Sequence, residues 1–162
     1  MSFPNYRISE ESPQFDIHEC GIKALFTGGM RVGRAKADEQ LPLYGGYVLN
    51  HDDLLVIGTN PLARITMTLS HDEWGTTFSR HVITDSLLNT GRADEAPPKF
   101  LGGYFNVDIL SYCRSSNRTG WYTAFLQLGP HCSQVLRFEM RPQHSIQDVV
   151  PESVVDSWKK DA

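Results

Sequence analysis

Residues 99–140 read KFLGGYFNVDILSYCRSSNRTGWYTAFLQLGPHCSQVLRFEM and hold three apolar runs parted by two turn-forming segments. In the first run, Phe105, Val107 and Ile109 alternate with polar residues, which is the period of a strand with one buried face. A polar segment rich in Ser, Arg and Asn follows it, and a Gly-Pro turn separates the second run from the third. The simplest structure for three such runs is a β-meander of consecutive antiparallel strands.

The same stretch predicts part of the core. The residues expected to be mostly buried are Phe105, Val107, Ile109, Phe125, Val135 and Phe138. The second run, residues 121–128, has apolar residues at both its odd and its even positions, as in a strand that is covered on both sides. The sequence therefore leaves open whether Trp121 or Tyr122 points inward.

Shorter strand signals precede this stretch. Apolar residues alternate with Arg and Thr over residues 63–69, which predicts a half-buried antiparallel strand. Residues 47–57 read as a hairpin whose polar tip is Asn-His-Asp-Asp. Residues 76–90 carry both β-branched residues and helix-capping residues, so helix and strand both stay open there. A proline before an amphipathic pattern predicts a short helix over residues 151–158.

These signals together predict the fold class. About eight strand candidates at short spacing, without alternating helices, indicate an all-β fold, with α+β as the alternative. We expect a single antiparallel barrel or sandwich of about eight strands, with a C-terminal β-meander and a short C-terminal helix. With 162 residues the chain suits one domain. Residues 1–14 are expected to be a flexible N-terminal arm, and residues 15–162 a single β-rich domain.

Composition bounds the partners. The formal net charge is -4 and no run of Lys or Arg occurs, so we expect no nucleic-acid partner. No apolar stretch is long enough to cross a bilayer and no export signal is visible, so we expect a soluble, cytoplasmic protein with no membrane partner. Three Gly-Gly pairs lack the phosphate-binding and dinucleotide-binding motifs, and we expect no cofactor.

Two histidine motifs are the candidates for chemistry. The segments VLNHDDL at 48–54 and TLSHDEW at 68–74 each place a histidine, an aspartate and a second carboxylate after a predicted strand. If the two tips meet, these groups can act as a general acid and base, or bind a metal together with a third histidine such as His81. The catalytic candidates are His51, His71, Asp53 and Glu73. The alternative interpretation is that both motifs are ordinary polar turns.

A second set of residues suits binding. Aromatic residues beside the glycine pairs and acidic residues at the tips offer contact area and charge. The binding candidates are Tyr44, Tyr47, Asp52, Asp72, Tyr104 and Trp121. Cross-strand packing explains the aromatic residues equally well.

Two functional hypotheses follow. The first is a non-catalytic protein-binding or inhibitory module, of the immunity or antagonist kind, whose acidic tips suit a basic protein partner. The second is a small β-barrel enzyme or ligand-binding protein that takes a small-molecule ligand at a His/carboxylate acid-base or metal site. Both are compatible with a homo-oligomer. The distance between His51 and His71 separates them, because a shared site needs the two side chains close together.

Overall fold

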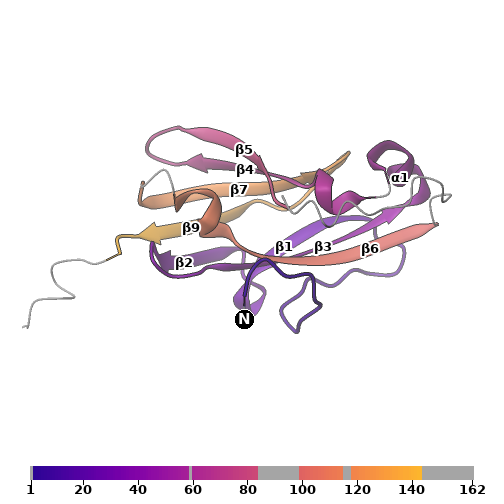
Figure 1. Ribbon diagram of the computed structural model, residues 1–162, viewed down its shortest axis with the longest axis horizontal. Coiled ribbons are helices and arrows are strands. Elements are labelled where there is room, and N and C mark those ends of the chain that lie inside the picture. The colour runs from indigo at the N-terminus through magenta and orange to yellow at the C-terminus, as the bar shows by residue number, and fades with distance from the viewer. Residues whose placement is uncertain (1, 59, 84–98, 115–117, 144–162) are drawn as a thin grey trace, which may run out of the picture.

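The structure is a computed structural model that describes residues 2–58, 60–83, 99–114 and 118–143. Most of this part of the chain is β-strand, arranged in two facing sheets (Figure 1). The smaller sheet has the order β1-β3-β6, with β1 at Gly21–Phe26, β3 at Pro42–Asn50 and β6 at Phe100–Asp108. None of the helices described is long and apolar enough to cross a membrane.

The larger sheet has six strands. Its order is β2-β9-β7-β4-β5, with β2 at Val32–Lys36, β9 at Leu136–Arg141, β7 at Gly120–Leu128, β4 at Thr66–His71 and β5 at Thr77–His81. The short strand β8, His131–Cys132, pairs with β7. The helical elements of the described residues are α1 at His51–Ile57 and the 3-10 turns η1 at Thr27–Gly29, η2 at Pro61–Arg64 and η4 at Ile109–Tyr112.

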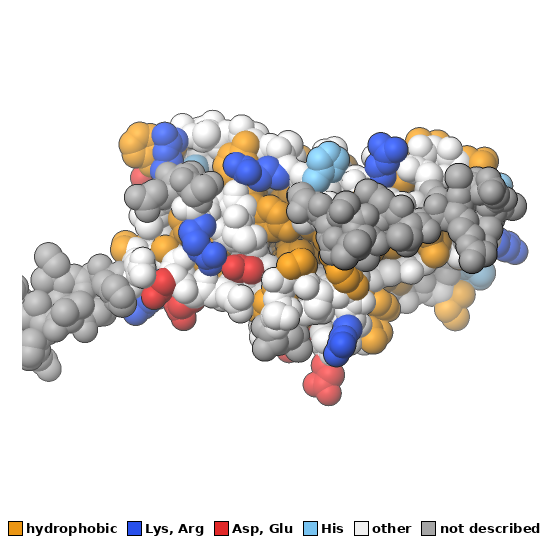
Figure 2. Space-filling view, viewed as in Figure 1, with side chains coloured by type: hydrophobic (Ala, Val, Ile, Leu, Met, Phe, Trp, Pro, Cys, Tyr) orange, Lys and Arg blue, Asp and Glu red, His pale blue; other side chains and the backbone are white. Residues whose placement is uncertain are grey.

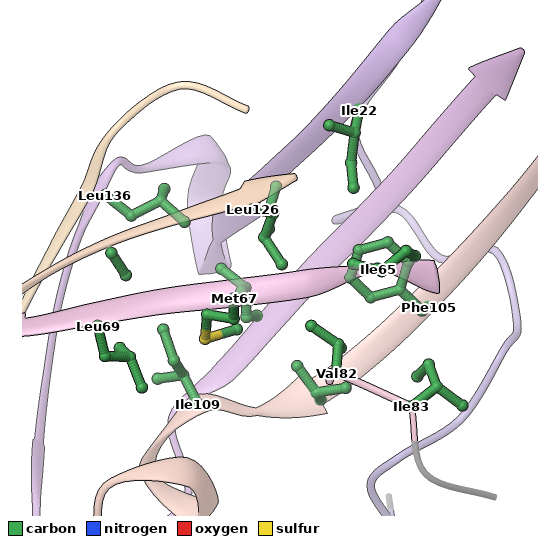
Figure 3. Packing of buried hydrophobic residues seen from close by; sticks show 14 of the residues in the cluster. Ile22, Ile65, Met67, Leu69, Val82, Ile83, Phe105, Ile109, Leu126 and Leu136 are labelled. Atoms are coloured by element: carbon green, nitrogen blue, oxygen red, sulfur yellow. The ribbon is translucent and has the colours of Figure 1, made fainter. Parts of the chain in front are cut away.

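The core lies between the two sheets, so the fold is a sandwich. Side chains of β4 and β7, such as Met67 and Leu126, meet Ile22 of β1 and Phe105 of β6, and all four are buried (Figure 3). Alternate residues of each strand point inward because a strand places successive side chains on opposite faces. The predicted mostly β fold is confirmed.

The predicted core is right for four residues and wrong for one. Phe105, Val107, Ile109 and Phe138 are buried, whereas Val135 is 57% exposed. Phe125 is only half-buried. In β7 the inward positions belong to Tyr122, Ala124, Leu126 and Leu128, so Phe125 falls on the outer face with Trp121.

The predicted meander is wrong in its first link. β7 and β9 pair in the larger sheet, but β6 pairs with β3 in the smaller one. The chain changes sheets at η4, because the Asp108 carboxylate accepts hydrogen bonds from the Leu110 and Leu41 backbone N–H groups and ends β6 in a turn. The pairing of β2 with β9 is parallel, so the larger sheet is mixed and the antiparallel prediction fails for this pair.

The predicted hairpin over residues 47–57 is also wrong. β3 ends at Asn50 and α1 begins at His51. The Asn50 side chain accepts from the Asp53 N–H at 2.8 Å, and the Asp53 carboxylate accepts from the Asn50 N–H at 3.2 Å. This reciprocal capping box satisfies two N–H groups that a helix start otherwise leaves without partners.

The other predicted elements are tested only in part. Residues 77–81 form β5, while residues 84–98 and the predicted helix at 151–158 lie outside the described residues. The N-terminal segment contacts the smaller sheet, since Asn5 and Asn106 exchange backbone hydrogen bonds of 3.0 and 2.8 Å. A flexible arm at 1–14 and a single domain at 15–162 stay predictions.

Candidate functional site

The first histidine tip is the start of α1. His51 and Asp52 are exposed there, and Asp53 is buried. Besides its capping role, the Asp53 carboxylate lies 2.9 Å from Nε2 of His131, in the short strand β8. Asp53 therefore connects α1 to β8, because its Oδ2 atom contacts both the Asn50 N–H and the His131 imidazole.

The second histidine is buried at the end of β4. Nδ1 of His71 accepts from the Glu73 and Trp74 backbone N–H groups, both at 3.2 Å, and Nε2 lies 2.7 Å from the Thr119 carbonyl oxygen. Because backbone N–H groups only donate and carbonyls only accept, these contacts fit the tautomer that carries its proton on Nε2. Its ring also packs edge-on against Tyr122, with centroids 4.8 Å apart. Both nitrogens are used within the protein, so His71 has no lone pair to offer a substrate.

The two histidine tips lie at opposite ends of the sandwich. α1 contacts η2, which directly precedes β4, whereas His71 is the last residue of β4. Figure 1 shows β4 running away from α1 along the length of the molecule. The arrangement does not support a shared site for His51, His71, Asp53 and Glu73, and a catalytic role for them stays a prediction. Among the described residues, no three His, Cys, Asp or Glu side chains gather as metal ligands.

Cys113 is the most deeply buried of the three cysteines, with no solvent exposure. Burial is the main cause that raises the pKa of its thiol to about 12. The thiol is therefore protonated at neutral pH and behaves as a small apolar side chain.

The predicted tyrosines do not form one binding face. Tyr44 and Tyr47 are buried, and burial raises the pKa of Tyr47 to about 12. Tyr47 lies over Gly103 on the neighbouring strand, where an added Cβ atom would come within 2.5 Å of the Tyr47 hydroxyl oxygen. Tyr104 is half-buried on the other face of the same sheet. These contacts are cross-strand packing, in which a ring covers a glycine.

Two binding candidates do come together, on the outer face of the larger sheet. Asp72 follows β4, and its backbone N–H donates to the Trp121 carbonyl of β7 at 3.0 Å. The Asp72 carboxylate forms an ion pair with Arg137 of β9 and accepts from the Thr123 hydroxyl at 3.1 Å. The Arg137 guanidinium in turn lies 5.0 Å from the centre of the Trp121 ring.

A second arginine completes this arrangement. The Arg34 guanidinium of β2 lies 5.3 Å from the centre of the Trp121 ring, so two cations contact one indole. We call this surface the Trp121 face, and its residues are Arg34, Asp72, Trp121, Thr123, Phe125, Arg137 and Glu139. The Arg34 and Arg137 side chains are about half exposed, at 57% and 49%.

Sequence reasoning missed both arginines. The alternation of Arg137, Glu139 and Arg141 along β9 indicates an exposed charged face, and that signal was present in the sequence. Their meeting with Trp121 depends on the order β2-β9-β7, which no local pattern reveals. In comparisons with protein-family models and with curated proteins, the chain matches none of them.

Proposed function

We propose that this protein is a non-catalytic protein-binding or inhibitory module that contacts its partner through the Trp121 face. The observation that carries the proposal is that the Arg34 and Arg137 guanidinium groups lie 5.3 and 5.0 Å from the centre of the half-buried Trp121 ring, on the outer face of the larger sheet. Tryptophan and arginine are the residues that most often dominate the binding energy of protein interfaces. Side chains that already contact one another before binding lose less conformational entropy on association.

The surroundings of Trp121 also suit an interface. Val32 occupies the same outer face in β2 and is 47% exposed, and Phe125 is half-buried there. Thr68 and Ser79, which lie across β4 and β5 in register with Phe125, carry hydroxyl groups joined at 3.0 Å. An apolar centre with hydroxyl and charged groups around it is the usual composition of a protein-binding surface.

Charge supports an acidic partner. The outward side chains of β2 and β9 include Arg34, Lys36, Arg137 and Arg141, against the carboxylates of Glu139 and Asp72. The described part of the chain holds 12 Lys and Arg and 12 Asp and Glu, so the surplus negative charge of the protein belongs to the other residues. In the view of Figure 2 most visible acidic side chains lie in the lower half, apart from several basic ones above.

The acidic tips lend less support to the basic partner that the sequence suggested. Asp53 is buried against His131, and Asp72 is paired with Arg137, so neither offers a free charge. A surface with an excess of exposed guanidinium groups attracts a protein with exposed Asp and Glu, and it accelerates their association at low salt.

The test uses site-specific photocrosslinking in the cells that make the protein. A photoreactive residue at Thr123, on the Trp121 face, should capture an acidic protein, while the same residue at Val56, on exposed α1, should not. The captured protein is then purified and its affinity for variants measured by calorimetry. Trp121→Ala should weaken binding by roughly 30-fold or more, the level of an interface hot spot.

The matched control is Trp74→Ala. Trp74 is exposed, and the Arg118 guanidinium lies 4.7 Å from the centre of its ring, but Trp74 lies outside the Trp121 face. Its replacement should leave the affinity unchanged. Crosslinks that form from Val56 rather than Thr123, no crosslink from either position, or equal affinities of Trp121→Ala and wild type would each reject the proposal.

A further inference from the structure

A cavity of about 370 Å³ opens at the end of the larger sheet that carries His71. The buried side chains of His71 and Tyr122 form its deep wall. Phe78 and Arg80 of β5, together with Thr76 just before this strand, also line it. Tyr112 of η4 and Arg118, which precedes β7, complete the described lining. Within the described ranges, β5 is the edge strand of the larger sheet and pairs with β4 alone.

The charge of this cavity is positive. Arg80 and Arg118 are both exposed at its rim, and no Asp or Glu is among its described lining residues. Neither guanidinium forms an ion pair with a carboxylate of the described residues, unlike Arg114, which lies 3.1 Å from Asp108. Two cations at one cavity, without a carboxylate partner among the described residues, favour an anionic occupant.

Both arginines are held in place by neighbours that leave most of their donors free. The Arg118 guanidinium stacks on Trp74 and donates one hydrogen bond to the Thr76 hydroxyl at 2.6 Å. The Arg80 guanidinium lies 5.2 Å from the centre of the Phe78 ring. A guanidinium has five N–H donors in a rigid fork, so each arginine can still bind a carboxylate or phosphate through two of them.

Other polar groups of the lining already form hydrogen bonds within the protein. His71 donates from Nε2 to the Thr119 carbonyl, and the Tyr112 hydroxyl donates to the Val82 carbonyl at 2.7 Å. The donors left for a ligand are therefore mainly those of Arg80 and Arg118. This pattern selects for negative charge and gives little recognition of a neutral polar molecule.

The remaining wall is aromatic. Phe78, Tyr112 and Tyr122 offer ring surfaces, and the volume suits one small ring with an attached charged group. We propose that this cavity binds a small aromatic anion, a planar ring that bears a carboxylate or a phosphate, with the anion on Arg80 and Arg118 and the ring against the aromatic wall.

This site is distinct from the Trp121 face. Trp121 and Tyr122 are successive residues of β7, so their side chains point to opposite faces of the sheet. The proposed ligand binds on the inner side and the proposed partner on the outer side. Loss of one activity therefore leaves the other testable.

The experiment is a titration of the ¹⁵N-labelled full chain, followed by NMR of its backbone amides. The probes are phenyl phosphate, benzoate, inorganic phosphate, benzyl alcohol and benzylamine. Phenyl phosphate or benzoate should give saturable shifts centred on the amides of Thr76, Phe78, Arg80 and Arg118, and comparison of the two distinguishes phosphate from carboxylate. Inorganic phosphate should bind about tenfold more weakly for lack of a ring, and benzylamine should give no shift at these residues.

Variants distinguish specific binding by Arg80 and Arg118 from non-specific electrostatic attraction to the protein. Arg80→Gln and Arg118→Gln should each lower the affinity for the tighter-binding of phenyl phosphate and benzoate by about tenfold or more, since each removes charged hydrogen bonds. Arg118→Lys should recover part of the affinity, because it restores the charge without the fork. Arg64→Gln, at an exposed position of η2 outside this cavity and outside the Trp121 face, is the control for net charge and should leave anion binding at the cavity unchanged.

Three results would overturn the proposal. The first is the absence of saturable shifts with either aromatic anion at about 10 mM probe, which corresponds to binding too weak for a formed site. The second is equal affinity for benzyl alcohol and for the anions. The third is unchanged anion affinity in the double variant Arg80→Gln/Arg118→Gln; both side chains are exposed at the cavity rim, so this variant is expected to fold.

Discussion

Residues 48–53 and 68–73 have matching sequence patterns, yet the first segment starts a helix and the second extends a strand. In the first, Asp53 is buried and His51 is exposed. In the second, His71 is buried and Asp72 is exposed. The buried polar side chain is therefore the second carboxylate in the first segment and the histidine in the second.

The difference arises at the small polar residue before each histidine. The Asn50 side chain accepts from the Asp53 N–H and starts α1. The equivalent hydroxyl of Ser70 is joined at 2.9 Å to the Thr77 hydroxyl on β5, so it is engaged across the sheet. The strand therefore continues one residue further, and its alternation directs His71 into the core. A neighbouring strand can override a local capping signal.

The largest expected effect is the difference in stability between the His71→Ala and His51→Ala variants. His71→Ala removes a buried ring and leaves the Thr119 carbonyl and two N–H groups without their partners, so the free energy of unfolding should fall by about 3 kcal/mol. His51→Ala, at an exposed position, should change it by less than about 0.5 kcal/mol. Urea unfolding followed by circular dichroism measures both, and similar losses would contradict the assignment of roles.

For the two aspartates, the larger loss of stability is expected in the first segment. Asp53→Ala removes the capping box and the partner of His131, and it should cost about 2 kcal/mol. Asp72→Ala removes an exposed ion pair with Arg137, which should cost about 0.5 kcal/mol or less. The same unfolding measurement applies, and a larger loss for Asp72→Ala would contradict the importance of the buried carboxylate in the first segment.

A smaller loss of stability is expected when the polar residue before each histidine, Asn50 or Ser70, is replaced. Asn50→Ala should destabilise the protein by about 1 kcal/mol and speed hydrogen exchange of the Asp53 amide, because that amide loses its acceptor. Ser70→Ala should cost only a few tenths of a kcal/mol, roughly the value of an exposed hydroxyl pair. Asn50→Ser serves as a control that keeps a capping oxygen, and it should retain most of the stability.

The smallest effect is expected for Thr77→Val. This change frees the Ser70 hydroxyl while keeping a residue that favours strands, so stability should change by less than about 0.5 kcal/mol. Hydrogen exchange at the Glu73 and Trp74 amides should stay slow, since His71 still accepts from both. Fast exchange at these amides would show that the hydroxyl pair, and not the buried histidine, holds the segment in its strand conformation.

Local periodicity predicted the strands well where one face is buried. The alternation around Met67 and the run through Phe105 and Val107 both mark inward positions. The capping box was also readable, because Asn50 and Asp53 have the N-cap and third-position spacing of a helix start. It was interpreted as a hairpin tip, since Asn and Asp favour turns as well.

Other features depend on pairing between distant segments. Phe125 and Tyr122 are both aromatic, and only the position of the opposite sheet decides which one is buried. The Trp121 face needs β2 beside β9 and β9 beside β7. The cavity near His71 joins residues of β5, η4 and the segment before β7. No local pattern carries this information, because it is set by the free energy of the whole core.

The parallel pairing of β2 with β9 has a consequence for the order of folding. Val32 pairs with Arg137, about 100 residues later in the chain, so among the strands that the structure describes β2 has no sheet partner until β9 exists. During synthesis the ribosome must release β9 before the larger sheet can gain its β2 edge. Closing such a long loop costs chain entropy before any pairing compensates it. Refolding should therefore take milliseconds to seconds, as in other sandwiches rich in non-local contacts.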